Sequence, residues 1–340
     1  MEKLYLANTI LCIYGNPVLG DFLHIMFPII FNIKCKNPKA IVDFKCSSNN
    51  TSVQLLAKKM DILNYNVIQK IKYDFVLCLS EANEHSNIEH TDVFYLTKLA
   101  KQERFDYIST ISDKNFRQKI LAYFRQTFHS NSTAPAGIVI NIGSTCHNGN
   151  PVNNNELFQD RMATVILENL GEKFTLVGRK YELVSEKLKA LLLKPQVRIC
   201  IRNFLDKTEN VLELCTLLFN CKLVIVRNTG VMHLAGLCNC NLITLTTRHS
   251  ILSQYKILFG QLKNVQVYVK EQYKESEHPY YNDKWAPLSD TIIDVVEFKG
   301  FNQRYNDSIP EIISHHIHSY IENPAFNSKK IRLGGIKFHI

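Results

Sequence analysis

Apolar residues in the first part of the chain form short continuous runs, and longer amphipathic stretches separate them. The apolar runs lie at residues 9–14, 40–45, 73–80 and 105–110. Stretches with helical spacing lie between them, as in "TSVQLLAKKMDIL" at residues 51–63. Buried runs that alternate with helices are typical of a parallel sheet covered on both faces. The first part of the chain therefore predicts an α/β domain.

A second series of the same kind follows a small, polar segment at residues 129–137. Its predicted strands lie at residues 138–143, 174–178, 197–202, 223–227, 242–246 and 265–269. Its predicted helices lie at residues 155–170, 182–193 and 208–219, and a fourth begins at residue 230. We expect two facing Rossmann-like domains, at residues 1–132 and 136–305, with the binding site in a cleft between them. Residues 270–287 are predicted as loop, and residues 308–323 as a final amphipathic helix.

Composition and charge narrow the class of partner. The chain has 340 residues, of which 46% are hydrophobic and 21% are charged, as in ordinary globular proteins. The net charge is 40 − 31 = +9, which favours an anionic partner. The basic residues are spread along the chain, with neither a Lys/Arg block nor zinc-finger spacing, and this argues against a nucleic acid.

The cysteines and the apolar runs predict a cytoplasmic protein. The ten cysteines form no CxxC pair and no regular framework, which favours a reducing compartment. Cys238 and Cys240 form a C-x-C pair that is better explained as buried thiols than as metal ligands. The N-terminus lacks the pattern of a signal peptide, and the longest apolar run, residues 22–31, is too short to span a bilayer. We expect membrane association to be peripheral at most.

Three loops after predicted strands carry candidate chemistry, and the first is "GNPVLGD" at residues 15–21. Asp21 lies where a helix begins, so it can be an N-cap residue whose oxygen accepts a helix N–H. At the edge of a cleft, the same carboxylate can act as a general base.

The second loop, residues 141–155, is rich in Gly, Ser, Thr and Asn. Ser144 and Thr145 offer hydroxyl groups to phosphate oxygens, although an ordinary surface loop has the same composition. In the third loop, Thr229 and Gly230 lie where a strand passes into a helix, and the N–H groups of residues 230–232 should be unsatisfied there. Such a helix N-terminus is a phosphate site. His233 alone fits a packing histidine as well as a ligand.

Taken together, these motifs resemble glycosyltransferase family 9, the bacterial heptosyltransferase family of lipopolysaccharide assembly. The similar segments are "LGD" at residues 19–21, "IGST" at 142–145, "VGR" at 177–179 with Glu182, and "DKTENVLELCTLLFNCKLVIVRNTGVMHLAGLCN" at 206–239. The last segment is the most specific one. In order and spacing, the resemblance covers roughly residues 9–247.

The resemblance implies a GT-B fold, with the acceptor on the first domain, the donor on the second, and the helix at 308–323 packed back on the first domain. It implies an inverting transfer, without metal or cofactor, of heptose or a related sugar from a nucleotide-diphosphate sugar such as ADP-heptose. The acceptor would be a lipopolysaccharide- or lipooligosaccharide-type glycolipid at the cytoplasmic face of the inner membrane. No DxD motif is placed to neutralise the leaving diphosphate, so preorganised donors must do so.

The resemblance also implies roles for individual residues. Asp21 matches the base that deprotonates the acceptor, and Glu182 matches a nucleoside contact. The donor site would comprise Ser144, Thr145, Arg179, Glu182, Asn228, Thr229, Gly230, Met232 and His233. Gly20, Arg227 and Arg248 are further candidate loop or phosphate contacts.

Two departures from the family pattern keep an alternative open. The family usually has Asp where this chain has Asn228, and its second loop usually carries a cation that "HNGNPVNNN" lacks, apart from His147. Arg227, Arg179 and Arg248 are candidate substitutes for that cation. The alternative is a catalytically degenerate relative that still binds a nucleotide sugar. A dinucleotide-dependent enzyme is disfavoured because no GxGxxG follows a strand.

Overall fold

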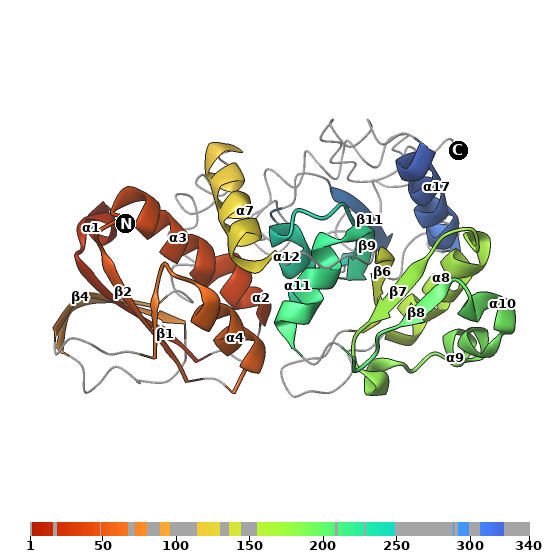
Figure 1. Ribbon diagram of the computed structural model, residues 1–340, viewed down its shortest axis with the longest axis horizontal. Coiled ribbons are helices and arrows are strands. Elements are labelled where there is room, and N and C mark those ends of the chain that lie inside the picture. The colour runs from red at the N-terminus through yellow and green to blue at the C-terminus, as the bar shows by residue number, and fades with distance from the viewer. Residues whose placement is uncertain are drawn as a thin grey trace, which may run out of the picture. The chain divides into compact units, whose positions relative to one another are not determined.

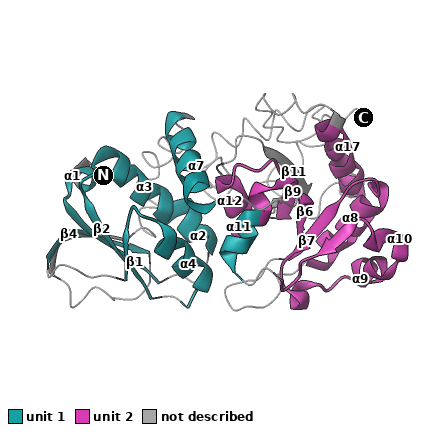
Figure 2. Cartoon of the chain, in the orientation of Figure 1, with its two compact units in different colours: residues 1–130, 210–216 teal, residues 131–209, 217–340 magenta. Residues whose placement is uncertain are grey.

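A computed structural model shows the architecture of the chain (Figure 1). It describes residues 2–15, 19–47, 49–66, 72–79, 89–95, 114–129, 136–143, 155–207, 210–227, 229–248, 288, 292–298 and 307–322. The strands predicted at residues 105–110 and 265–269 and the loop predicted at 270–287 lie outside these ranges. The chain divides into two compact units (Figure 2). Unit 1 comprises residues 1–130 and 210–216, and unit 2 comprises residues 131–209 and 217–340.

Unit 1 is built on a parallel sheet of five strands in the order β3-β2-β1-β4-β5. The strands are β1 (Thr9–Tyr14), β2 (Ile41–Cys46), β3 (Asn64–Tyr65), β4 (Lys72–Leu79) and β5 (Glu89–Tyr95). The helices are α1 (Glu2–Leu6), α2 (Leu19–Asp21), the π-helix η1 (Phe22–Met26), α3 (Phe27–Lys36), α4 (Thr51–Lys59) and α7 (Lys114–Phe128). The central strand β1 and most of β4 are buried, largely apolar runs, as expected where a sheet is covered on both faces.

Aromatic side chains join α3 to α7 in unit 1. The ring centroids of Phe31 and Phe116 lie 5.7 Å apart, and those of Phe27 and Phe124 lie 5.9 Å apart. These are ordinary distances for favourable ring pairs. The packing fixes α3, which continues the helical segment that begins at Leu19.

Unit 2 is built on a parallel sheet of six strands in the order β11-β10-β9-β6-β7-β8. The strands are β6 (Gly137–Asn141), β7 (Phe174–Val177), β8 (Ile201–Asn203), β9 (Cys221–Arg227), β10 (Leu242–Arg248) and β11 (Ile292–Phe298). The helices are α8 (Asn155–Glu168), the 3-10 helix η2 (Lys180–Glu182), α9 (Glu186–Leu193), α10 (Pro195–Arg198), α11 (Val211–Phe219, whose first residues belong to unit 1), α12 (Gly230–Leu237) and α17 (Ile309–Glu322). Strands β6 and β9 lie at the centre of this sheet.

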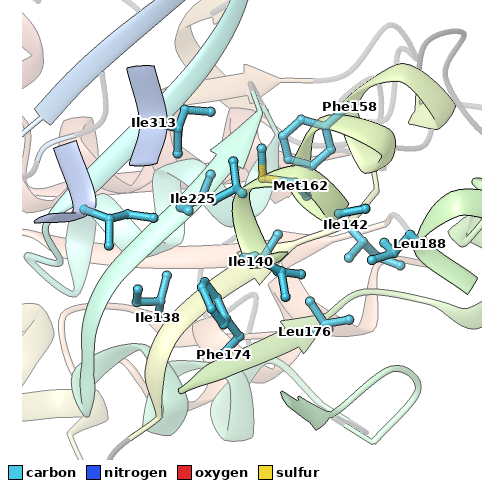
Figure 3. Close-up of a cluster of buried hydrophobic side chains, with 14 of the residues drawn as sticks. Ile138, Ile140, Ile142, Phe158, Met162, Phe174, Leu176, Leu188, Ile225 and Ile313 are labelled. Atoms are coloured by element: carbon cyan, nitrogen blue, oxygen red, sulfur yellow. The ribbon is translucent and has the colours of Figure 1, made fainter. Parts of the chain in front are cut away.

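The core of unit 2 lies between its central strands and α8 (Figure 3). Alternate residues of β6 and β9, among them Ile140 and Ile225, meet Phe158 and Met162 of α8. Alternation places these strand residues on one face of the sheet. The residue after Ile225 on this face is Arg227, at the end of β9. A charged side chain therefore lies where the apolar face ends.

The final helix corrects one prediction. We expected it to pack on the first domain, but α17 lies in unit 2, and Ile309, Ile313 and Ile317 belong to the core of that unit. Ser314 also accepts a hydrogen bond from Asn169 at 3.0 Å and donates one to Glu168 at 2.5 Å. The apolar face of the helix and the hydrogen bonds of Ser314 therefore both hold α17 in unit 2.

A second correction concerns residues 197–202, which were predicted as one strand. The structure has α10 over Pro195–Arg198, and only Ile201–Asn203 form a strand. Pro195 is well suited to a first helical position because its fixed φ fits a helix and its missing N–H is not needed there. This local preference outweighs the apolar run.

Candidate functional site

The candidate site in unit 2 lies where β9 passes into α12. Thr229 has extended backbone angles, φ −145° and ψ 169°, and α12 begins at Gly230. The N–H of Met232 donates to the carbonyl of Thr229 at 3.0 Å. The prediction that this N–H lacks a partner is therefore wrong. The amides of Gly230 and Val231 remain in the first turn, where a helix supplies no partner for them. The helix mouth therefore has two amide donors rather than three.

The hydroxyl of Thr229 adds a third polar group to this helix mouth. Its Oγ1 is buried, and among the described residues it finds no hydrogen-bond partner. A buried polar atom without a partner costs free energy, so such atoms commonly mark a site completed by a ligand, an ion or water. The hydroxyl can donate to an anionic oxygen.

Asn141 brings a further buried polar group from the neighbouring strand, which the sequence pattern did not predict. It is the last residue of β6, which pairs with β9 so that Ile140 lies opposite Ile225. Asn141 is 4% exposed, and its Oδ1 has no partner within the described ranges. This oxygen can accept a hydrogen bond from a hydroxyl or amino group of a ligand.

Arg227 carries the cation nearest to Thr229 along the chain, and its position is fixed by α8. Its Nη1 donates to Oδ1 of Asn155 at 2.8 Å, and its guanidinium lies 5.8 Å from the ring centroid of Phe158. Asn155 is the first residue of α8, directly after the loop that lacks the cation expected there. Both contacts preorganise the guanidinium at the end of β9.

Glu182 lies beneath two glycine-containing loops of unit 2. Its Oε2 accepts the N–H of Arg179 at 2.8 Å, and the residue is 7% exposed. A Cβ on Gly143 would lie 2.6 Å from Glu182, and one on Gly178, whose φ is +133°, would lie 3.0 Å from its Oε2. Only glycines leave room for the carboxyl group. Burial raises the pKa of Glu182, although the N–H of Arg179 acts in the opposite direction.

Gln159 of α8 fixes the loop that carries Glu182. Its Nε2 donates to the carbonyls of Ile142 at 2.9 Å and Glu182 at 2.6 Å. Its Oε1 accepts the N–H groups of Val184 and Ser185, each at 2.9 Å. The fully buried amide thus satisfies four backbone groups from two loops. Sequence reasoning missed this residue as well, since an isolated Gln in a helix gives no signal.

The remaining predicted donor residues differ in exposure, and some of them lie outside the described ranges. Met232 and His233 are 2% and 4% exposed, so their side chains pack inside unit 2. Arg179 is exposed, and Arg248 is the last residue of β10. Ser144, Thr145, Asn228 and the side chain of Arg248 lie outside what the structure describes, and their donor contacts stay predictions.

Asp21 lies in unit 1, at the end of α2 and directly after the buried Gly20. Its backbone is helical, with φ −66° and ψ −36°, and its side chain makes no capping hydrogen bond. The capping interpretation of Asp21 is therefore wrong. The half-buried carboxylate lies beside Tyr14 of β1, whose pKa is raised by burial and then by the negative charge of Asp21.

Two general features bear on metal and membrane binding. The described residues contain no cluster of three or more His, Cys, Asp or Glu side chains that could hold a metal ion. None of the described helices combines the length and the apolar character needed to cross a membrane.

Comparison with solved structures shows what this chain resembles. Over 93% of this chain and 99% of the other, it matches the structure of E. coli ADP-heptose LPS heptosyltransferase II with a TM-score of 0.57 and 15% identity. It matches E. coli heptosyltransferase WaaC with ADP over 94% and 99% of the two chains, with a TM-score of 0.54 and 12% identity. The chain has the fold of these heptosyltransferases.

At these identities the similarity is one of fold, and it agrees with the resemblance carried by the motifs. The predicted fold class, α/β of the GT-B type with two parallel, Rossmann-like sheets, is confirmed. Neither the models of protein families nor the curated proteins include a match to the sequence.

Proposed function

We propose that this protein is a glycosyltransferase that uses a nucleotide-diphosphate sugar. The observation that carries the proposal is the buried hydroxyl of Thr229 at the start of α12, which has no hydrogen-bond partner among the described residues and lies beside the amides of Gly230 and Val231. A helix N-terminus favours negative charge, and a diphosphate supplies oxygens for all three donors.

Arg227 completes the diphosphate site in this proposal. The leaving nucleotide diphosphate gains negative charge in the transition state, and preorganised donors are the means to stabilise it where no metal does so. Of the three candidate arginines, Arg227 alone has described contacts that hold its guanidinium at the end of β9. We therefore assign to Arg227 the role of the cation that the second loop lacks.

Asp21 acts as the general base of an inverting, metal-independent transfer. It removes the proton of the acceptor hydroxyl, the hydroxyl oxygen attacks the anomeric carbon, and the nucleotide diphosphate leaves from the opposite face. The absence of a capping role supports this assignment, because the carboxylate is not needed to begin the helix. General base catalysis of this kind contributes about 10²–10⁴-fold to a rate.

The similar structures suggest the substrates. One is an ADP-heptose LPS heptosyltransferase, and another holds ADP. For this chain we propose ADP-heptose as the donor and a lipopolysaccharide-type glycolipid as the acceptor, met at the cytoplasmic face of the inner membrane.

A donor screen tests this proposal. ADP-, UDP-, GDP- and CMP-sugars are compared by thermal shift in EDTA, and the best binder is assayed for transfer of radiolabelled sugar to lipopolysaccharide acceptors. Stabilisation by ADP-heptose and transfer in EDTA are expected. Failure of every nucleotide sugar to stabilise the protein would overturn the proposal. Binding without transfer from any donor would instead favour the degenerate relative, which Asn228 motivates.

A further inference from the structure

Three thiols gather at the end of β9 that is remote from Thr229. Cys221 begins β9, Cys238 is the C-cap residue of α12, and Cys240 precedes β10. The thiols of Cys221 and Cys240 both donate to the carbonyl oxygen of Leu218, at 3.0 Å and 3.2 Å. Two sulfur atoms that share one acceptor are close neighbours, although the residues are far apart in sequence.

The strand register explains this closeness. β9 and β10 are parallel, with Val224 opposite Leu242, and the N–H of Val224 donates to the carbonyl of Asn241 at 2.9 Å. Counting back from this pair places Cys240 beside the first residues of β9. Neighbouring strands lie about 4.7–4.9 Å apart. By this count Cys240 lies opposite Lys222, one residue from Cys221, and a diagonal offset of about 3.3 Å along the strand keeps the Cα separation within the range of about 4.4–6.8 Å that a disulfide needs.

The thiols also differ in exposure and acidity. Cys221 is partly exposed, whereas Cys238 and Cys240 are buried. Burial opposes ionisation of Cys240, but hydrogen bonds from Cys221 and Cys238 outweigh it and lower the pKa of Cys240. The pKa of Cys221 is raised, first by its hydrogen bond to Cys240 and then by burial. Cys240 is therefore the thiol that ionises first, and the thiolate is the reactive form.

We propose that Cys221 and Cys240 are a site of reversible oxidation, at which a hydroperoxide converts the two thiols into a disulfide. One thiolate attacks a peroxide oxygen, the O–O bond breaks, and sulfenic acid and hydroxide form. The second thiol displaces the sulfenic hydroxyl, and the S–S bond forms as water leaves. With hydrogen peroxide, two thiols and one peroxide give one disulfide and two waters. A dithiol reverses the reaction by exchange.

The disulfide would join the start of β9 to the segment after α12. It would close a loop that contains Thr229, Gly230 and all of α12. Closing a loop restricts the unfolded chain, so the oxidised protein should have the higher melting temperature. This chemistry does not depend on the transferase proposal, and it is tested on the protein without any substrate.

The test is oxidation of the reduced full-length chain with a small excess of hydrogen peroxide, followed by alkylation and peptide mapping by mass spectrometry. We expect the chain to lose two titratable thiols and the mass of two hydrogen atoms, a linked peptide pair containing Cys221 and Cys240, and full reversal by dithiothreitol. Cys221→Ser and Cys240→Ser should each abolish the linked pair. Cys200→Ser, at a buried cysteine elsewhere in unit 2, should leave it unchanged.

The mapping of the natural chain decides the proposal even where a variant fails to fold. Retention of the Cys221 and Cys240 thiols under conditions that oxidise the exposed Cys35 would overturn it. A link between Cys238 and Cys240, or oxidation of Cys221 and Cys240 to sulfinic acids without a link, would overturn it as well.

Discussion

Nη1 of Arg227 donates a hydrogen bond to Oδ1 of Asn155 at 2.8 Å, and this bond joins the end of β9 to the first residue of α8. In the proposed function, it presents the guanidinium to the donor diphosphate. The preorganisation comes from α8, since Phe158 lies beneath the same guanidinium. In the proposed function, the end of β9 thus supplies the cation that the family pattern places in the second loop, before α8.

Replacing Arg227 by Met should weaken donor binding. Hydrogen bonds to charged groups contribute about 1.5–3 kcal/mol, so we expect the Kd for ADP to rise by about 10- to 100-fold. Arg227→Lys should recover only part of the loss, because Lys cannot reproduce the planar, forked contacts. Isothermal titration measures both effects. Arg198→Met, at an exposed arginine of α10, is the control. An unchanged Kd for Arg227→Met would remove this residue from the diphosphate site.

Replacing Thr229 by Val should weaken ADP binding without lowering the stability of the fold. The hydroxyl has no partner in the described part of the chain, so its loss should leave the free energy of unfolding unchanged or slightly higher. ADP binding should fall by about 5- to 10-fold, as expected for one hydrogen bond of about 1 kcal/mol or slightly more. Thr164→Val on α8 is the matched control. Equal ADP affinity in Thr229→Val and the natural chain would contradict the role of the hydroxyl.

Replacing Asp21 by Asn should abolish transfer and preserve donor binding. The carboxylate makes no capping hydrogen bond, so the helix should form without its charge. We expect kcat to fall by about 10²–10⁴-fold, with an unchanged Kd for ADP. Single-turnover transfer and calorimetry measure the two quantities. Glu186→Gln, at an exposed carboxylate, should keep full activity. A turnover near that of the natural chain in Asp21→Asn would exclude the residue as the base.

The sequence predicts more of the fold than of the candidate site. Apolar runs separated by amphipathic stretches predicted most strands, because buried parallel strands have few polar positions. The strand predicted at residues 197–202 was wrong because Pro195 starts a helix. The position of α17 was also wrong, since an apolar face formed by Ile309, Ile313 and Ile317 does not specify which surface covers it.

For the site, the junction at Thr229 and Gly230 was predicted because a strand followed by Thr-Gly is a local pattern, and the structure places the start of α12 there. Asn141, Asn155 and Gln159 were missed because a single buried amide leaves no periodic signal. Their importance comes from tertiary contacts, such as the bond from Arg227 to Asn155. The closeness of Cys221 to Cys240 depends likewise on the register of β9 and β10, which the sequence does not display.

Replacing Gln159 by Leu should destabilise unit 2. The change leaves four backbone groups of two loops without their partner, and each buried group left unpaired costs about 1–3 kcal/mol. Because loops can relax and admit water, we expect a loss of about 3 kcal/mol or more in the free energy of unfolding. Urea denaturation measures it, with Gln196→Leu at an exposed position of α10 as control. Equal losses in the two variants would show that the four bonds contribute nothing specific.

Replacing Glu182 by Gln should change how stability depends on pH. Burial raises the pKa of Glu182 in the folded protein, so the neutral carboxyl group is favoured more there than in the unfolded chain. The raised pKa adds to the free energy of unfolding. This contribution is fully present below the pKa of the unfolded chain, about 4.3, and is lost as the pH rises through the pKa of the folded protein. Gln stays neutral and can accept the N–H of Arg179, so the variant should gain stability relative to the natural chain as the pH rises from about 4 to about 7.5.

Urea denaturation at several pH values across this range measures the difference between the two chains, and Glu186→Gln provides an exposed carboxylate for comparison. A difference that stays constant with pH would show that Glu182 ionises in the folded protein as readily as in the unfolded one. If the stability of Glu182→Gln relative to the natural chain falls as the pH rises, folding lowers the pKa of Glu182 instead of raising it. In that case the N–H of Arg179 would stabilise the charged form of Glu182 more than burial opposes it.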